Sequence, residues 1–143
     1  MKLLVAVDFS PGSQRVAAFA RTLANALRSE TWLLHVADPD PDFVGYEAGP
    51  QVERDLVAGD MRQQHRDLQN IADEWRAAGL DCTALLVQGP TNEKILSEAV
   101  RMGADLIVLG SHSTSVLKRW FVGSTSDQVL QHTQIPVLVV PSV

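Results

Sequence analysis

Residues 109–126 read LGSHSTSVLKRWFVGSTS and continue an apolar run that begins at Asp105. The run stops at Gly110, and a second glycine, Gly123, precedes three hydroxyl side chains and the start of a helical pattern. Glycine lets an anion approach the backbone closely, and the first N–H groups of a helix have no partner within the helix. A strand that ends in this way, followed by such a helix start, is typical of α/β proteins that bind phosphate.

The rest of the chain alternates short apolar runs with helical patterns. Uninterrupted apolar runs predict strands that are buried on both faces, and apolar residues at helical spacing predict the helices between them. The length of the chain predicts one domain, residues 1–143. The strict alternation predicts an open, doubly wound parallel sheet with helices on both faces. Strands are expected at 3–7, 31–36, 82–87, 105–109 and 136–141. Helices are expected from a cap at Ser10 or Ser13 to about Arg28, and at 51–78, 91–103 and 126–132.

Local signals predict where the helices begin and end. Ser10 or Ser13 is expected to cap the first helix, because a serine hydroxyl can accept a hydrogen bond from an N–H group of the first turn. Gly79 and Gly103 are expected to end the second and third helices, since glycine readily adopts the left-handed conformation found there. The apolar face of the first helix is expected to comprise Val16, Phe19, Ala20, Leu23 and Leu27.

Composition restricts the class of protein. The net charge of −5 argues against a nucleic-acid partner, because phosphate backbones are bound by positively charged surfaces. The N-terminal apolar run is too short for a signal peptide or a membrane span, so no membrane attachment is expected. The lone cysteine, Cys82, cannot form an internal disulfide and has no basic neighbour in sequence, which favours a buried inert thiol and a cytoplasmic location. The four histidines are too scattered to form a metal site.

A ligand site is expected beyond the carboxyl ends of the strands. In an open doubly wound sheet, ligands bind where the strand order reverses, and the first and fourth strands are the natural neighbours there. Asp8, the turn after it, Val36 to Asp38 and residues 110–126 should therefore meet in one crevice. Asp8 could accept hydrogen bonds from ribose hydroxyls or an amine, or it could simply cap the turn after its strand. His35, inside an apolar strand, is expected to be a satisfied core or edge residue.

Several segments together resemble the universal stress protein family over nearly the full length of the chain. They are VAVDFS at 5–10, LLHV at 33–36, GADLIVLGSH at 103–112, and GS at 123–124 before PVLVV at 136–140. With this resemblance, we expect a Rossmann-like, adenine nucleotide alpha hydrolase-like fold, an open five-stranded sheet in the order 3-2-1-4-5.

The resemblance also implies an ATP site. ATP-binding members of the family carry Gly, two residues, Gly, nine residues, Gly, and then Ser or Thr. Gly110 fits the first position and Gly123-Ser124 the last two, whereas Ser113 stands in place of the second glycine. Serine adopts a positive φ less freely than glycine, although its hydroxyl could donate a hydrogen bond. The contacts implied for adenosine, ribose and phosphates are Ala6, Asp8, Val36, Leu109, Gly110, Ser113, Gly123, Ser124, Thr125 and Ser126.

Three functions follow as hypotheses. The first is a module of the stress response that binds ATP or another adenine nucleotide, with or without Mg²⁺, and acts as a switch toward an unknown protein partner. It is expected to form a homodimer through Val137 to Val140, because this apolar strand would leave an open edge and because subunits of the family meet there. The second is a stress protein that acts by protein contacts without nucleotide, which Ser113 favours. The third is a slow ATPase, although no catalytic set can be assembled from the sequence.

Overall fold

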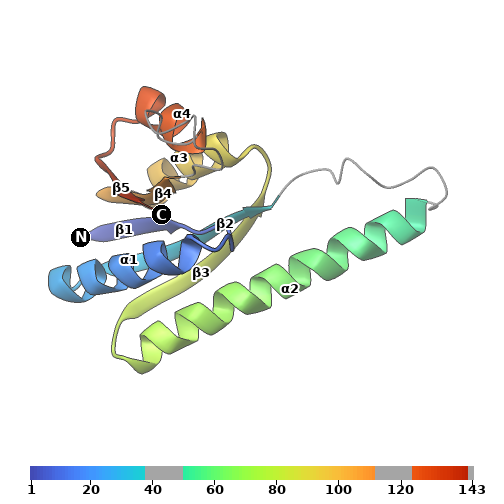
Figure 1. Ribbon diagram of the computed structural model, residues 1–143, viewed down its shortest axis with the longest axis horizontal. Helices are drawn as coiled ribbons and strands as arrows, with labels where there is room; N and C mark the ends of the chain where they lie inside the picture. Colours follow the sequence, from blue (N-terminus) through green and yellow to red (C-terminus); the bar gives the residue numbers. More distant parts are fainter. Residues whose placement is uncertain (38–49, 112–123, 142–143) are drawn as a thin grey trace.

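The computed structural model describes residues 1–37, 50–111 and 124–141. The described elements are β1 (Lys2–Ala6), α1 (Ser13–Leu27), β2 (Glu30–Ala37), α2 (Pro50–Ala77), β3 (Asp81–Gln88), α3 (Thr91–Met102), β4 (Leu106–Ser111), α4 (Ser124–His132) and β5 (Val137–Pro141). The five strands form one parallel sheet in the order β3-β2-β1-β4-β5 (Figure 1). The predicted alternation, fold class and strand order are confirmed.

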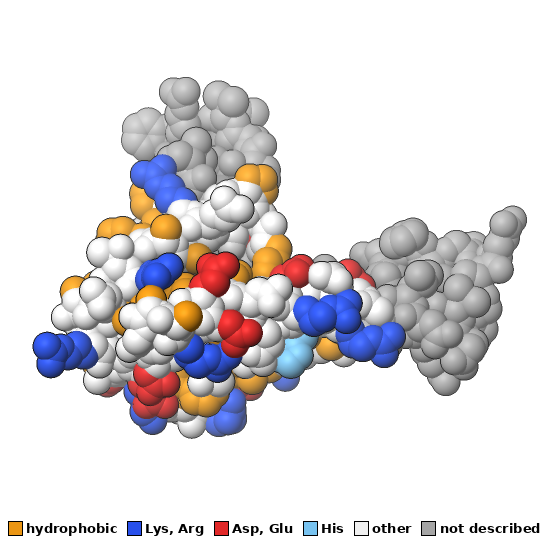
Figure 2. Space-filling model, turned by 90° about the horizontal axis from the view of Figure 1, so that it is seen from below, with side chains coloured by type: hydrophobic (Ala, Val, Ile, Leu, Met, Phe, Trp, Pro, Cys, Tyr) orange, Lys and Arg blue, Asp and Glu red, His pale blue; other side chains and the backbone are white. Residues whose placement is uncertain are grey.

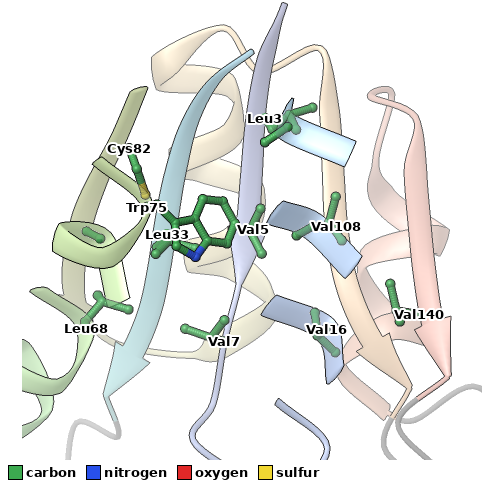
Figure 3. Close-up of a cluster of buried hydrophobic side chains, with 13 residues drawn as sticks. Leu3, Val5, Val7, Val16, Leu33, Leu68, Trp75, Cys82, Val108 and Val140 are labelled. Carbon is green, nitrogen blue, oxygen red and sulfur yellow. The ribbon is translucent and has the colours of Figure 1, made fainter. Parts of the chain in front are cut away.

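Apolar side chains fill both faces of the sheet because alternate residues of each strand point to opposite sides. Leu3 and Val5 of β1 pack on one face, with Val16 of α1 and Trp75 of α2 (Figure 3). Leu4 packs on the other face, in the cluster that α3 and α4 cover. Each central strand therefore contributes side chains to the hydrophobic core on both faces of the sheet, which explains the uninterrupted apolar runs of the sequence.

Hydrogen bonds close the amino end of the sheet. The Lys2 N–H donates to the Asp105 carboxylate at 2.7 Å, and the Asp105 N–H donates back to the Lys2 carbonyl at 2.8 Å. The Lys2 ammonium donates to the Met102 carbonyl at the end of α3, at 3.2 Å. Nearby, the buried hydroxyls of Ser29 and Thr31 are 3.1 Å apart and hydrogen-bonded. These four polar side chains therefore each bond to a group at the same end of the sheet.

The 28-residue helix α2 extends well past the sheet (Figure 1). Near its C-terminal end, Leu68, Ala72 and Trp75 are buried against β2 and β3. Lys or Arg and Asp or Glu side chains are interspersed over the face of the molecule that carries α2 (Figure 2). Over the described residues, no helix is long and apolar enough to span a membrane.

Both predicted glycine stops are confirmed. Gly79 has φ +86°, and the Leu80 N–H donates back to the Trp75 carbonyl at 3.0 Å. Gly103 has φ +69° and its N–H donates to carbonyls in the last turn of α3. Glycine suits both positions because it has no Cβ to clash in the left-handed region.

Two expectations for α1 were wrong. Gly12 occupies the N-cap position without a side-chain hydrogen bond, whereas Ser10 bonds to Asp8 and Ser13 lies inside the helix. The apolar face is also narrower than predicted, since Phe19 is 47% exposed and Leu27 is 40% exposed. Phe19 lies on the flank of the buried stripe, and Leu27 is the last helical residue, beyond the packed turns.

Candidate functional site

A cavity of about 230 Å³ lies at the carboxyl end of the sheet, between β1, β2 and β4 and the first turns of α1, α3 and α4. This is the point where the strand order reverses between β1 and β4. The structure brings these predicted site residues together in its lining: Ala6, Asp8, Val36, Leu109, Gly110, Thr125 and Ser126. Ser124 is the first residue of α4. Ser113 and Gly123 lie outside the described residues.

The turn after β1 holds the Asp8 carboxylate at the cavity wall. Asp8 Oδ1 accepts hydrogen bonds from the Ser10 N–H at 3.0 Å and from the Ser10 hydroxyl at 2.7 Å. Phe9, between them, has φ +60°, a conformation that costs an L-residue about 1 kcal/mol. Asp8 therefore stabilises the turn after β1 and also lines the cavity, so the two interpretations from the sequence are compatible.

His35 connects β2 to the end of β1 beneath this turn. Its ring Nδ1 lies 2.8 Å from the Val7 carbonyl, to which a protonated Nδ1 donates, and the residue is 7% exposed. The Phe9 ring packs on the imidazole with 4.7 Å between ring centroids. The prediction of a satisfied core histidine is confirmed, and the bond supports the segment from which Asp8 projects.

On the other side of the cavity, Ser126 attaches α4 to the end of β4. Its hydroxyl donates to the Gly110 carbonyl at 3.0 Å, and the residue is 2% exposed. This bond places the first turn of α4 beside Gly110, as the sequence pattern of strand, glycine and helix start indicates. Because the Ser126 hydroxyl already donates to a carbonyl of the protein, the backbone N–H groups of the first turn of α4 are the donors that could face a ligand.

Three helix N-termini converge on the cavity. Ser13 contributes from α1, Thr91 from α3 and Thr125 from α4. The N–H groups of each first turn lack intrahelical partners, and each helix carries a partial positive charge at this end. Their common orientation favours an anionic ligand, because the crossovers of a parallel sheet bring every helix start to the same edge.

Sequence reasoning missed Ser13, Thr91 and Ile95 as lining residues. Ser13 was interpreted only as a cap, and the other two only as the start of a helix. The available signal was the alternation itself, since the helix that follows each strand must begin at the sheet edge where ligands bind. Among the described residues, no group of three or more His, Cys, Asp and Glu side chains is placed to hold a metal ion.

Cys82 lies far from this cavity, beside Thr31 at the amino end of the sheet. It is 1% exposed, and burial raises the pKa of its thiol to about 12. The Arg76 guanidinium, which donates to the Cys82 carbonyl at 3.1 Å, opposes this shift only in part, and Asp81 adds to it. The predicted buried thiol is confirmed, although a basic neighbour that the local sequence did not reveal lies beside it.

The model of the universal stress protein family matches residues 1–141. The chain belongs to the universal stress protein family. A universal stress protein of Thermus aquaticus is 33% identical over 144 residues, and the match covers 96% of each chain. MJ0577, a universal stress protein of Methanocaldococcus jannaschii, is 26% identical over 97% of this chain and 93% of its own length. The solved MJ0577 structure has a TM-score of 0.80 over 98% of this chain and 94% of its own, at 27% identity.

Two further universal stress proteins share the fold and were solved with nucleotides. One, in complex with cAMP, has a TM-score of 0.69 at 21% identity and covers 100% of this chain and 98% of its own. The other, from Archaeoglobus fulgidus in complex with dAMP, has a TM-score of 0.63 at 20% identity and covers 97% and 96%. At these identities the likeness is one of fold.

Proposed function

We propose that this universal stress protein binds an adenine nucleotide, ATP or a close relative, at the carboxyl end of its sheet. The observation that carries the proposal is the convergence of three helix N-termini on one cavity that also contains Asp8. Helix termini favour phosphate, and a carboxylate at a strand end suits ribose hydroxyls. Proteins of the same fold that hold cAMP and dAMP support adenine nucleotides as the ligand class.

The lining suggests an orientation for the nucleotide. The base would lie over Ala6 and bond to the Val36 backbone, with the ribose beside Asp8. The phosphates would lie against Gly110 and the first turn of α4. The remaining residues of the family motif, Ser113, Gly123 and Ser124, come after Gly110 in the sequence and lead into that turn. Mg²⁺ would be held mainly by the phosphates, as is usual for polyphosphate nucleotides.

Binding and switching fit this cavity better than rapid hydrolysis. A general base must reach the attacking water, and the two titratable side chains of the described lining are otherwise engaged. His35 bonds to the Val7 carbonyl, and Asp8 Oδ1 accepts two bonds from Ser10. We therefore propose a single-domain cytoplasmic protein whose surface toward a partner changes with nucleotide occupancy.

The homodimer belongs to the same proposal. β5 is an edge strand of the sheet, and the apolar groove beside it is lined by Leu138, Val139 and Val140 together with the exposed Phe19 of α1. An apolar edge strand favours pairing with a second copy. Sedimentation velocity should show a dimer that Val139→Lys converts to a monomer. A wild-type monomer at micromolar concentration would contradict this part of the proposal.

Nucleotide binding is tested on the protein as it is purified. Mass spectrometry should detect an adenine nucleotide that co-purifies, and calorimetric titration of the stripped protein with MgATP should show saturable binding. Asp8→Ala should weaken binding about 10–100-fold, because it removes a charge-assisted hydrogen bond. Asp60→Ala, on α2 and outside the cavity lining, is the matched control and should bind as the wild type does. No nucleotide and no heat at millimolar MgATP would rule the proposal out.

A further inference from the structure

A groove lies between α1 and α2, on the face of the sheet that both helices cover. Val16 of α1 and Trp75 of α2 belong to the same core cluster, which forms the base of the groove (Figure 3). The groove has a volume of about 530 Å³. Its walls are residues 13–21 of α1 and 67–75 of α2, which is about two turns and 12 Å of each helix. α2 packs at the β3 edge of the sheet, so this α1–α2 groove and the groove beside β5 are different surfaces.

The floor of the α1–α2 groove is apolar, and one end of it is aromatic. Ala17 and Ile71 are half-buried and pack against the core cluster, and Trp75 is buried there. Phe9 lines the groove at the start of α1 and is 37% exposed. Partly exposed aromatic and aliphatic side chains in a concave surface are suited to receive the apolar side chains of a partner.

The two walls of the groove carry opposite charges. Asp67 and Glu74 line it from α2 and lie seven residues apart, which places them on one face of that helix. Arg21 lines it from α1. Among the residues that the structure describes, neither Arg21 nor Glu74 is in an ion pair, whereas Arg76 of α2 pairs with Asp73. A bound segment that carried both charges would therefore find complementary charges on both walls.

The groove shares its upper end with the cavity at the carboxyl end of the sheet. Ser10 and Ser13 line both of them. Phe9 lines the groove, and its ring packs on the imidazole of His35, which lines the cavity, with 4.7 Å between ring centroids. The Asp8 carboxylate in the cavity wall holds Ser10 through two hydrogen bonds. A ligand that shifts Asp8 or Ser10 would therefore also change the shape of the groove.

We propose that the α1–α2 groove binds an amphipathic helical segment of a partner protein, and that nucleotide in the cavity changes the affinity of the groove for that segment. The walls are mostly helix interiors, whose backbone groups are bonded within each helix, so an extended strand would find few backbone partners. A helix needs none, because its own backbone is satisfied. The docking surface stands independently, whereas the coupling to nucleotide rests on the proposed function.

The charges of the walls define the chemistry of the segment. Its aliphatic side chains, at a spacing of three and four residues, would enter the groove over Ile71 and beside Phe9. Lysine or arginine would lie on the flank toward Asp67 and Glu74, and an acidic residue on the flank toward Arg21. Because the acidic wall carries two charges and the basic wall one, a segment with a net positive charge is favoured over one with a net negative charge.

Two fluorescent synthetic peptides that differ in charge alone test the docking surface. One has leucines at helical spacing, lysines on one flank and a glutamate on the other, and its twin has glutamates in place of the lysines. Fluorescence anisotropy with the full chain should show saturable binding of the lysine peptide, and binding of the twin about 10-fold weaker. Added salt should weaken the lysine peptide, because it screens partly exposed charges. Absence of saturable binding, or equal affinity for the two peptides, would overturn the docking surface.

Charge reversal on α2 locates the binding to this groove. The double variant Asp67→Lys, Glu74→Lys should weaken the lysine peptide about 10-fold and strengthen its glutamate twin, since the sign of the wall changes. Asp73→Lys reverses the charge of an exposed neighbour outside the groove lining and is the matched control, with affinities within about twofold of the wild type. Circular dichroism verifies that each variant is folded. Equal effects of the double variant and the control would place the peptide elsewhere and overturn the proposal.

The coupling is tested by titrating the lysine peptide with and without saturating MgATP, in buffers of equal ionic strength. MgATP should change the Kd of the peptide about 5-fold or more, and the peptide should change the Kd of MgATP by the same factor, because coupling between two sites is reciprocal. An unchanged peptide Kd in protein that binds MgATP by calorimetry would overturn the coupling. Peptide binding by a protein that binds no MgATP would overturn the proposed function and leave the docking surface standing.

Discussion

The polar groups at the two ends of the sheet lie in different surroundings. At the amino end, Lys2 and Asp105 bond to each other, and Ser29 bonds to Thr31. At the carboxyl end, Asp8 and Ser10 bond to each other at the wall of a cavity, and Phe9 has a backbone conformation that costs free energy. The difference is that hydrogen bonds close the amino end, whereas three helix N-termini line a cavity at the carboxyl end.

The largest expected effect comes from the core near the amino end. Leu3→Ala removes a side chain that is 0% exposed and should lower the free energy of unfolding by about 2–5 kcal/mol. Leu27→Ala, at a position 40% exposed, should cost less than about 1 kcal/mol. Urea unfolding followed by circular dichroism measures both. Similar losses for the two variants would contradict the packing described for α1 and β1.

The same substitution at the two ends provides the sharpest contrast. Ser29→Ala leaves the Thr31 hydroxyl buried without its partner and should lower the free energy of unfolding by about 1–3 kcal/mol. Ser13→Ala removes a hydroxyl for which the described residues provide no hydrogen bond, and it should change the free energy of unfolding by less than about 0.5 kcal/mol. Both are measured by urea unfolding without nucleotide. If Ser13→Ala were the more destabilising of the two, the comparison of the two ends would be wrong.

Cys82 should give the amino end a pH signature. The thiol titrates near 9.0 in the unfolded chain and near 12 in the folded protein, because burial disfavours the thiolate. Above pH 9 the unfolded state loses this proton while the folded state keeps it, so the contribution to stability is complete below pH 9 and is lost as the pH rises toward 12. Cys82→Ala should show a shallower loss of unfolding free energy over this range. Parallel pH profiles for the two proteins would refute the assignment.

The smallest effects concern the two described non-glycine residues with positive φ, one near each end of the sheet. Arg28 ends α1 with φ +48°, and Arg28→Gly should raise the free energy of unfolding by about 0.5–1 kcal/mol, since glycine favours this helix end. Phe9→Gly relieves a similar strain but loses the ring contact with His35, which is worth about as much. Its net change should stay within about 1 kcal/mol of zero. Thermal unfolding of both variants beside the wild type measures the difference.

Periodicity predicted the elements of the fold because buried strands and helix stops have strong local causes. Each of the five strands was visible as an apolar run, and Gly79 and Gly103 marked two helix ends. The start of α1 was not predicted correctly, because the Ser10 hydroxyl donates to Asp8 and does not accept a hydrogen bond from the first turn of the helix. The exposure of Phe19 depends on how wide a stripe of α1 the sheet covers. The spacing of apolar residues within one helix does not give that width.

The candidate site was predicted in part, for a related reason. Asp8 and Gly110 stand directly at strand ends, so the rule for parallel sheets located them. Ser13 and Thr91 enter the lining from helices, and their position depends on how each crossover returns to the sheet. The partners of His35 and Cys82 come from neighbouring strands or helices, and they too required the assembled structure.

The projecting part of α2 has a thermodynamic consequence. A 28-residue helix is about 42 Å long, whereas the eight-residue strands β2 and β3 beneath it span only about 26 Å. Helix initiation is unfavourable, and each further residue adds to a turn that already exists. The packing of Trp75 and Leu68 on the sheet stabilises the turns of α2 from which the rest of the helix extends. Gly59 lowers the helix propensity of the part that extends past the sheet. Loosening of the core around Trp75 should therefore also unwind the part of α2 that extends past the sheet. The helix content of that part then depends on the packing of Trp75 against the sheet.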